Sequence, residues 1–252
     1  MHSLKNNNII LVGASSGIGL ELAKQLAKEN CNLALLARRK DAIDEQVKYF
    51  GDFLGKIVSI KCDVTKKEEV NFAVAEAKNS LGTADVLIYN SGVSFPQNLK
   101  NFNSASAEET FKTNVIGFFN FCEVLIPEMI DNKKGLIVGV SSLADGRGFP
   151  KSGTYCASKA AMTVFLESLR TELKKYGVKV ITVKPGFVKT PMTDKNNFKM
   201  PFLMPVEKAA KIILNGIKKE KRIVQFPLPT MIGSKILRAL PDPIFEKIAK
   251  SY

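Results

Sequence analysis

Tyr155 and Lys159 are two side chains that together could carry out acid–base chemistry. They lie four residues apart in a stretch with helical periodicity, so they share one face of the helix. A tyrosine with its ordinary pKa of about 10 transfers protons poorly at neutral pH, whereas a nearby ammonium group favours the phenolate and lowers that pKa. Many exposed helix surfaces carry the same pair, so its meaning depends on the residues around it.

A glycine-rich turn at residues 13–19 could hold the phosphates of a dinucleotide. It follows an apolar run at residues 9–12 and precedes a helical pattern at residues 20–27. Such a turn directs backbone N–H groups and the positive end of the helix dipole at one point, where an anion binds. Its spacing differs from the common G-x-G-x-x-G fingerprint, and a tight turn without a chemical role is the alternative. The residues expected to contact a pyrophosphate are Gly13, Ser15, Ser16, Gly17, Ile18 and Gly19.

Arg38 and Arg39 follow the second apolar run, at residues 33–37. An acidic residue at this place binds the ribose 2′-hydroxyl of NAD, whereas guanidinium groups bind a phosphate in a bidentate manner. The pair therefore predicts NADP(H), with a solvated basic loop as the alternative. Asp63, with Val64 beside it, follows the third run and could accept a hydrogen bond from the adenine amino group.

Composition argues against several other kinds of chemistry. The single histidine is His2, so a histidine base or a histidine metal site is not expected. The four cysteines form no CxxC pair or zinc spacing, and we expect them to be reduced core thiols of a cytoplasmic protein. The N-terminus lacks the apolar run of a signal peptide. The longest nearly apolar stretch, from Val115 to Pro127, is too short to span a bilayer.

The order of apolar runs predicts an α/β fold of the doubly wound Rossmann type. Short, buried-looking runs that alternate with helical patterns are typical of a parallel sheet, here of about seven strands, with helices on both faces. The chain has 252 residues, of which 45% are hydrophobic, and we expect residues 1–252 to form one domain. The expected strands are at residues 9–12, 33–37, 57–60, 86–89, 137–140, 178–183 and 223–226, and the helical patterns are at 20–27, 70–77 and 154–176.

These residues together resemble the short-chain dehydrogenase/reductase family, in its compact form with a Tyr-x3-Lys active site. The resemblance covers about residues 6–226, and its motifs occur in the order and spacing of the family. The motifs are the glycine turn, Asn90-Ser91-Gly92, Asn114, Ser142, Tyr155 with Lys159, and Pro185-Gly186.

Two positions depart from the usual family pattern. Tyr89-Asn90-Ser91-Gly92 replaces the usual Asn-Asn-Ala-Gly, which is a small change. Ser15 and Ser16 stand where many NADP-preferring members carry a basic residue, so the NADP(H) prediction rests on the two arginines after the second run.

The resemblance implies a hydride transfer between a nicotinamide and a carbonyl or secondary alcohol. Tyr155 would be the general acid in reduction and the base in the reverse direction. Lys159 would hold the nicotinamide ribose hydroxyls and lower the pKa of Tyr155. Ser142 would donate a hydrogen bond to the substrate oxygen, and Asn114 would hold a water in a proton relay behind Lys159. A positioned acid accelerates such a step by roughly 10²–10⁴-fold.

The same resemblance places further residues at the cofactor. Thr190 would bind the nicotinamide carboxamide, with Val188 beside it. The remaining cofactor positions that it implies are Asn90, Ser91, Gly92, Pro185 and Gly186.

Residues 187–205 are expected to form a substrate lid with a short helix inside it. Its methionine and phenylalanine side chains suit a large, adaptable apolar pocket. We therefore expect a bulky lipophilic substrate that is sterol-like, retinoid-like or long-acyl. The alternative is that these side chains pack the loop against the core. The expected substrate contacts are Ser142, Met192, Phe198 and Phe202.

The net charge of +13 lies almost entirely in the last third of the chain. Residues 1–173 carry 20 basic and 19 acidic side chains, and residues 174–252 carry 17 and 5. The tail, about residues 231–252, has isoleucines and lysines at amphipathic spacing and predicts peripheral contact with an anionic membrane. Docking onto the fold or onto a sister subunit is the alternative. Nucleic acid is not expected, because no stacking array of aromatic residues accompanies the lysines.

Two other classes of function compete with the enzyme. One is an NADP(H)-binding redox sensor without turnover, and the other is a lipid-handling protein of the membrane surface. The complete set of Ser142, Tyr155, Lys159 and Asn114 argues against the sensor, which has no need of an acid. The family resemblance also implies a homodimer or homotetramer.

Overall fold

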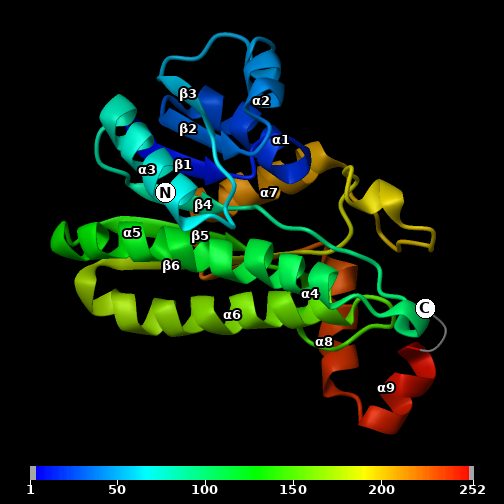
Figure 1. The fold of residues 1–252 in the computed structure, drawn as a ribbon. Coiled ribbons are helices and arrows are strands. Elements are labelled where there is room, and N and C mark those ends of the chain that lie inside the picture. The colour runs from blue at the N-terminus through cyan, green and yellow to red at the C-terminus, as the bar shows by residue number, and fades with distance from the viewer. Residues whose placement is uncertain (1–3, 250–252) are drawn as a thin grey trace.

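Seven parallel strands form one sheet in the computed structural model, which describes residues 4–249 (Figure 1). The strand order is β3-β2-β1-β4-β5-β6-β7, which is the doubly wound arrangement. Each strand contains one of the apolar runs predicted above. His2 and residues 250–252 of the tail lie outside the described residues. The strands are β1 Asn8–Val12, β2 Asn32–Ala37, β3 Ile57–Lys61, β4 Val86–Tyr89, β5 Gly135–Val140, β6 Val178–Pro185 and β7 Ile223–Phe226.

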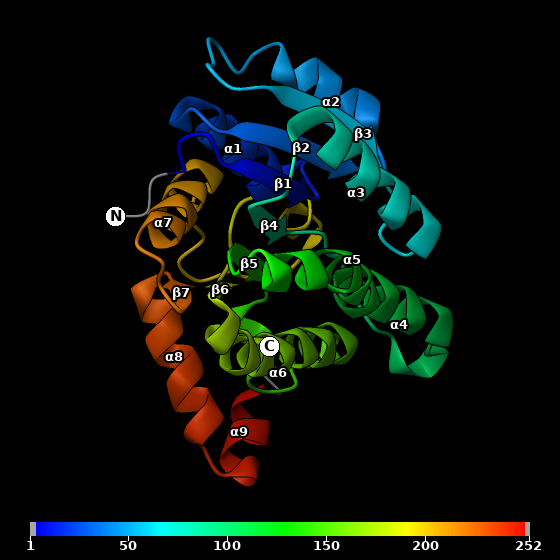
Figure 2. The same cartoon turned by 90° about the vertical axis from the view of Figure 1, so that its left-hand side faces the viewer.

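Helices cover both faces of the sheet, as Figure 2 shows for α1 and α7 on one side and α3 and α5 on the other. The predicted helical patterns correspond to α1, α3 and α6. The tail forms two helices, α8 and α9, which lie beyond β7. The helices are α1 Gly17–Leu26, α2 Lys40–Val47, α3 Lys67–Leu81, α4 Ser104–Phe111, α5 Gly117–Asp131, α6 Gly153–Leu173, α7 Val206–Lys218, α8 Leu228–Ala239 and α9 Asp242–Ala249.

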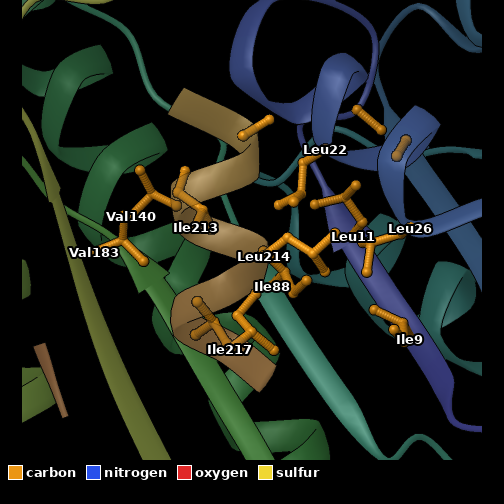
Figure 3. Packing of buried hydrophobic residues seen from close by; sticks show 14 of the residues in the cluster. Ile9, Leu11, Leu22, Leu26, Ile88, Val140, Val183, Ile213, Leu214 and Ile217 are labelled. Carbon is orange, nitrogen blue, oxygen red and sulfur yellow. The ribbon is translucent and has the colours of Figure 1, made fainter. Parts of the chain in front are cut away.

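Strand side chains alternate between two apolar cores. Ile9 and Leu11 point to the core under α1 and α7, whereas Ile10 and Val12 point to the core under α3, α5 and α6. Figure 3 shows Ile213, Leu214 and Ile217 of α7 packed toward strand residues of the first core. Burying one such side chain contributes about 1.5–3 kcal/mol relative to leaving it exposed. The cores hold the strand ends, and the turns that follow them, at fixed positions.

The apolar stretch from Val115 to Pro127 belongs to a longer helical run, Ser104–Asp131. This run comprises α4, a π-helical turn at Lys112–Ile116 called η3 here, and α5. The apolar stretch alone is shorter than a membrane span, as expected, but the whole helical run is long and apolar enough to cross a membrane by length and composition alone. Just over half of its most apolar window is buried inside the protein. A core helix passes the same test, and α5 packs against α3.

The sheet changes winding direction between β1 and β4, which lie side by side. In open α/β sheets ligands bind at the carboxyl ends of the strands at such a point. The turns after β1 and β4 meet there: a Cβ atom at Gly13 would lie 2.7 Å from the backbone nitrogen of Ser91. The fold therefore brings the glycine turn and the Asn90-Ser91-Gly92 segment into contact.

Candidate active site

The glycine turn is packed so tightly that side chains are excluded from it. A Cβ atom at Gly19 would lie 2.0 Å from the carbonyl oxygen of Gly13. Gly13 has φ +83°, a backbone conformation that favours glycine. The Asn90 side chain donates a 3.0 Å hydrogen bond from Nδ2 to the same Gly13 carbonyl. The turn after β1 is thus locked to the turn after β4.

The first turn of α1 has N–H groups suited to an anion. Ser16 is the N-cap residue, in extended conformation, and its side chain makes no capping hydrogen bond. The N–H groups at a helix N-terminus have no partner within the helix, and together with the helix dipole they favour a phosphate. Residues 15–18 are half-buried, so the turn is accessible from one side. The cradle made by Gly13 and Gly19 fits the pyrophosphate of a dinucleotide.

Arg38 and Arg39 lie directly after β2, and both are exposed. Within residues 4–249 neither forms an ion pair with a carboxylate, although the charge of Arg38 acts on Asp63. Two guanidinium groups are thus available at the position where a ribose phosphate is expected.

Asp63 is held in a fixed orientation after β3. Its Oδ1 accepts hydrogen bonds from the backbone N and from the Oγ1 of Thr65, at 3.0 and 2.8 Å. Partial burial raises the pKa of Asp63, but the Thr65 hydrogen bonds and the charge of Arg38 outweigh burial, and the net pKa is lowered. Val64 is buried in the core, and its carbonyl accepts from Asn120. Asp63 therefore presents an ionised carboxylate at the cofactor side.

Lys159 is buried beneath the Asn90-Ser91-Gly92 segment. Its Nζ donates a 2.9 Å hydrogen bond to the carbonyl oxygen of Val140 at the end of β5. A Cβ atom at Gly92 would lie 3.3 Å from Lys159 Nζ and 3.4 Å from Asn114 Oδ1. Gly92 thus leaves the space in which these two side chains approach. Burial lowers the pKa of Lys159 to about 8.

Tyr155 lies one turn before Lys159 on α6, and the Lys159 Nζ is 5.7 Å from the centre of its ring. Burial raises the pKa of Tyr155, and a hydrogen bond with Ser142 offsets part of that rise. The lowered pKa expected from the Tyr-x3-Lys pair is therefore not what the surrounding protein groups produce. The physical reason is that desolvation of Tyr155 dominates, while burial also disfavours the charge on Lys159.

Ser142 begins a short helical turn, η4, at Leu143–Asp145. Its Oγ accepts a 3.1 Å hydrogen bond from the backbone nitrogen of Ala144. A hydroxyl that accepts from the backbone keeps its hydrogen for donation. Ser142 and Tyr155 therefore form a hydroxyl pair that can hold one oxygen atom between them.

Asn114 lies in the π-helical turn η3 and is buried. Its Oδ1 accepts from the backbone nitrogen of Val93 at 2.8 Å. Its Nδ2 donates to the carbonyl of Val93 at 3.0 Å and to the Oγ of Ser158 at 2.9 Å. Because both amide hydrogens are used, a relay water could meet this side chain only at Oδ1. The side chain joins η3, the turn after β4 and α6.

The expected lid begins and ends at one bridge between Val188 and Met204. The backbone nitrogen of Lys189 donates to the Met204 carbonyl, and the nitrogen of Met204 donates to the Phe187 carbonyl, both at 2.9 Å. Within the loop, Thr193 donates from Oγ1 to the Val188 carbonyl at 2.7 Å. A short helical turn at Thr193–Lys195 lies inside it, as predicted.

Thr190 lies opposite the glycine turn. A Cβ atom at Gly17 would lie 3.2 Å from the Cγ2 of Thr190. Gly186, after β6, donates its N–H to the Phe226 carbonyl at 2.7 Å, which ties the start of this segment to β7. The structure thus brings Thr190, Val188 and Gly186 to the carboxyl ends of the strands, where the glycine turn also lies.

Four apolar side chains of the lid are exposed: Met192 at 41%, Phe198 at 44%, Phe202 at 60% and Leu203 at 41%. The Phe198 ring lies 5.9 Å from the ring of Phe187. None of these four belongs to a core cluster, so the alternative, that the apolar side chains of the lid pack the loop against the core, holds for Met204 and not for these four. Val188 and Met204, which close the loop, are the buried ones.

Sequence reasoning missed a group of buried and half-buried polar residues behind Ser142. Ser141, Thr163 and Lys184 contact one another or Asp145 in the space between β5, β6 and α6. Thr163 follows Lys159 by four residues, and that helical spacing was the available signal. All four cysteines are free and buried, and among the described residues no group of His, Cys, Asp or Glu is placed to hold a metal ion.

Comparison with known proteins gives the class. The family profile described as short chain dehydrogenase matches residues 7–200. An uncharacterized oxidoreductase of Myxococcus xanthus is 32% identical over 253 residues, covering 99% of each chain. The ketoacyl reductase HetN of Nostoc is 30% identical over 220 residues, which are 87% of this chain and 76% of HetN. The chain therefore belongs to the short-chain dehydrogenase/reductase family and is an oxidoreductase.

Two further comparisons agree with this class. The 3-oxoacyl-[acyl-carrier-protein] reductase FabG of Staphylococcus epidermidis is 31% identical over 193 residues, covering 75% of this chain and 78% of FabG. A crystal structure of a short-chain dehydrogenase/reductase from Burkholderia phymatum in complex with NAD has a TM-score of 0.84 at 20% identity. It covers 93% of this chain and 94% of that one, and it shows the shared fold.

Proposed function

We propose that this oxidoreductase uses NADP(H) to reduce the carbonyl group of a bulky lipophilic substrate, or to oxidise the corresponding secondary alcohol. One observation carries the proposal. Ser142, Tyr155 and Lys159 converge at the carboxyl ends of the strands, beside a glycine turn that fits a pyrophosphate. When bound, the nicotinamide supplies or accepts the hydride. This chain's own residues bind the cofactor, orient the substrate and transfer the proton.

The preference for NADP(H) is supported by the two exposed arginines after β2. Arg38 and Arg39 have no carboxylate partner in an ion pair within the described part of the chain, so a 2′-phosphate would meet two available guanidinium groups. Asp63 would accept from the adenine amino group, since its carboxylate is already oriented by Thr65. The solved relative from Burkholderia phymatum is a complex with NAD, and a direct comparison of the two cofactors decides this point.

Proton transfer is assigned to Tyr155. The raised pKa of Tyr155 keeps its hydroxyl protonated at neutral pH, which suits the acid in carbonyl reduction. Ser142, which is hydrogen-bonded to Tyr155, would donate its hydrogen to the substrate oxygen when that oxygen binds between the two hydroxyl groups and negative charge develops there. Lys159 would hold the ribose hydroxyls from its buried position and resupply the proton, because a pKa of about 8 allows it to lose one near neutral pH. For the reverse reaction the positive nicotinamide ring would favour the phenolate.

A bulky apolar substrate is supported by the exposed side chains of the lid. Met192, Phe198 and Phe202 are large and apolar, and they project from a loop whose two ends are closed by the Val188–Met204 bridge. Exposed apolar groups beside an active site are typical of a surface that a ligand covers. HetN and FabG carry ketoacyl and 3-oxoacyl reductase in their names, which is compatible with a long-acyl carbonyl compound.

The test is an assay of reduced-cofactor oxidation over a panel of steroids, retinoids, long-chain acyl ketones, quinones and small carbonyls. NADPH and NADH are compared for each compound at equal concentration. We expect turnover with bulky lipophilic carbonyls and with NADPH. Turnover restricted to small polar carbonyls would contradict the substrate class, and equal rates with NADH would contradict the cofactor preference.

The outer face of the tail supports a second proposal, contact with an anionic membrane by a protein that otherwise resides in the cytoplasm. Leu228, Ile232 and Ile236 are exposed on α8 at four-residue spacing, and Ile244 and Ile248 are exposed on α9. On α8 the charged side chains are Lys235 and Arg238, with no acidic residue, whereas on α9 Lys247 is accompanied by Asp242 and Glu246. If two copies of the chain met through α8, their basic faces would repel each other, whereas an anionic bilayer complements the charge of α8. We also propose that the protein forms the homodimer or homotetramer that the family resemblance implies, through surfaces other than the tail.

Vesicle co-sedimentation tests the membrane proposal. We expect binding to vesicles of phosphatidylcholine with phosphatidylglycerol, weaker binding at high salt, and little binding to phosphatidylcholine alone. Ile232→Ser with Ile236→Ser should reduce binding. Leu54→Ser with Leu99→Ser is the matched control, because these leucines are exposed elsewhere on the surface. Unchanged sedimentation of the tail variant with anionic vesicles would overturn the proposal. If the same substitutions convert the protein from a dimer to a monomer, the face contacts a sister subunit instead.

A further inference from the structure

A buried ion pair lies directly behind the candidate active site. Lys184 Nζ is 2.7 Å from Asp145 Oδ2, and the two side chains are only 8% and 6% exposed. Lys184 lies on β6, one residue before Pro185, and Asp145 ends the turn η4 that begins after Ser142. None of the steps assigned above uses this pair.

A chain of hydrogen bonds connects the pair to α6. Thr163 donates from Oγ1 to the same Asp145 oxygen at 2.6 Å. Ser141 Oγ lies 2.8 Å from Thr163 Oγ1 and 2.9 Å from the carbonyl oxygen of Lys159, and its one hydrogen can be donated to either. Tyr155, Lys159 and Thr163 follow one another at four-residue spacing, so they share a face of the helix. Asp145 is therefore the point at which β6, η4 and the catalytic face of α6 meet.

Buried charges are costly, and such a pair calls for an explanation. Desolvation of two ions offsets much of their attraction, so a buried ion pair is often no more stabilising than apolar residues of the same volume. Removing one partner leaves an uncompensated buried charge, which is strongly unfavourable. The best-supported benefit of such a pair is a single fixed geometry. Here the Lys184–Asp145 pair fixes the position of the turn η4, which follows Ser142.

We propose that Lys184 and Asp145 are positioning residues, which hold the turn at Ser142 against the Tyr155–Lys159 face of α6. The inference deepens the proposed function, because it rests on the acid–base role assigned to Tyr155. The pair is buried, and the contacts of its carboxylate are with Lys184 and Thr163. Its first effect is geometric: it keeps the Ser142 and Tyr155 hydroxyl groups directed at one oxygen atom.

The second effect of the pair is electrostatic. The charge of Asp145 raises the pKa of Tyr155, and Lys184 is the partner that neutralises this charge. Without Lys184 the pKa of Tyr155 should rise further. Without the Asp145 carboxylate it should fall. The other charged or titratable groups around these residues are Lys159 and Cys156 on α6, Arg147 after η4, and Arg238 of α8, which lies beside Gly146.

The experiment measures the titration of Tyr155 without turnover, so it does not depend on finding the substrate. Tyrosinate absorbance is recorded against pH for the wild type, Lys184→Met, Asp145→Asn and the double variant. Each protein is paired with its own Tyr155→Phe counterpart, and the difference isolates Tyr155 from the other tyrosines. We expect a shift to higher pH for Lys184→Met, a shift to lower pH for Asp145→Asn, and an intermediate position for the double variant.

Matched controls separate positioning from general stability. Lys78→Met breaks another partly buried ion pair, with Glu128 at 2.5 Å between α3 and α5, and should leave the Tyr155 titration unchanged. Thermal unfolding at each pH identifies any variant that does not fold. Asp145→Asn is nearly isosteric, so its shift to lower pH decides the matter even if Lys184→Met does not fold. NADPH affinity should stay within about twofold of the wild type in every folded variant, because neither residue touches the cofactor site.

Once a substrate is known, kcat/KM should fall by on the order of 10–100-fold in each single variant, because a small displacement of a catalytic group has effects of this size. The proposal is overturned if both single variants shift the Tyr155 titration in the same direction, or if neither shifts it while both lower the unfolding temperature. If the opposite shifts occur but no carbonyl compound is reduced, the positioning proposal stands and the proposed reaction fails.

Discussion

The Lys159 ammonium group donates a 2.9 Å hydrogen bond to the carbonyl oxygen of Val140. This contact joins α6 to the carboxyl end of β5 with a side chain that is largely shielded from water. The lysine lies under Gly92 and beside Tyr155, at the cofactor site. This buried location disfavours the positively charged form of its side chain. That conflict has a measurable consequence for stability.

Lys159→Met should change the pH dependence of unfolding. In the wild type the lysine is protonated up to pH 10.5 when unfolded but only to about pH 8 when folded. Between these values the unfolded state binds more protons, so this residue makes the free energy of unfolding rise with pH. Its contribution is on the order of 3 kcal/mol. Lys159→Met should remove that rise in urea denaturation curves.

The comparison is the difference between the variant and the wild type, because cysteines and tyrosines titrate in the same range. Lys175→Met removes an exposed lysine near the end of α6 and serves as the control. An identical pH dependence of the free energy of unfolding in Lys159→Met and the wild type would contradict the assigned burial of a charge.

Gly19→Ala should abolish cofactor binding. The added Cβ would lie 2.0 Å from the Gly13 carbonyl and 2.6 Å from Asn90 Nδ2, and neither can move without opening the turn. Overpacking typically costs about 1–3 kcal/mol, and the displaced N–H groups would no longer meet a pyrophosphate. Gly148→Ala is the control, because no atom of residues 4–249 beyond its chain neighbours lies within 4 Å of the added Cβ. Fluorescence titration with NADPH should show binding to the control and not to Gly19→Ala.

Replacing both Arg38 and Arg39 by alanine should change cofactor preference. Hydrogen bonds to a charged group contribute about 1.5–3 kcal/mol each, so loss of the pair should raise the Kd for NADPH by at least about tenfold. The Kd for NADH should change little. Lys61→Ala removes an exposed cation at the end of the neighbouring strand β3 and provides the control for general charge effects. A parallel loss of affinity for both cofactors would show that the arginines do not contact a 2′-phosphate.

Phe198→Ala should affect large substrates selectively. Phe198 is held against Phe187, with ring centres 5.9 Å apart, and part of its surface remains exposed. Loss of this apolar surface should raise KM for a bulky carbonyl compound by about tenfold, with little change for a small one and none in NADPH affinity. Phe72→Ala, at an exposed position on α3, is the control. An equal change for large and small substrates would place Phe198 outside the substrate contact.

Much of this architecture could be predicted from local pattern. Each strand contains a largely apolar run of four to six residues, and burial on both faces of the sheet leaves such runs nearly continuous. The glycine turn was also predictable, because at Gly13 and Gly19 contact with other backbone excludes a side chain. The rest depends on contacts between distant segments. Lys184 reads as an ordinary basic residue until its pairing with Asp145 is seen, and the exposure of Phe202 depends on how its loop closes.

The pKa of Tyr155 shows a second limit of sequence reasoning. The Tyr-x3-Lys spacing predicts an ammonium beside the phenol and hence a lowered pKa. Burial of both groups follows from the packing of α6, which the spacing alone does not reveal, and burial changes the direction. Tyr155 can act as the acid in reduction whether its pKa is raised or lowered.

The assignment of Tyr155 as the acid is tested most directly by Tyr155→Phe. This change removes one hydroxyl group and keeps the ring. The measurement is NADPH oxidation with a reducible carbonyl compound, alongside NADPH affinity by fluorescence. The account predicts that turnover falls by at least about 10²-fold while NADPH affinity stays within about twofold of the wild type. Wild-type turnover in Tyr155→Phe would contradict it.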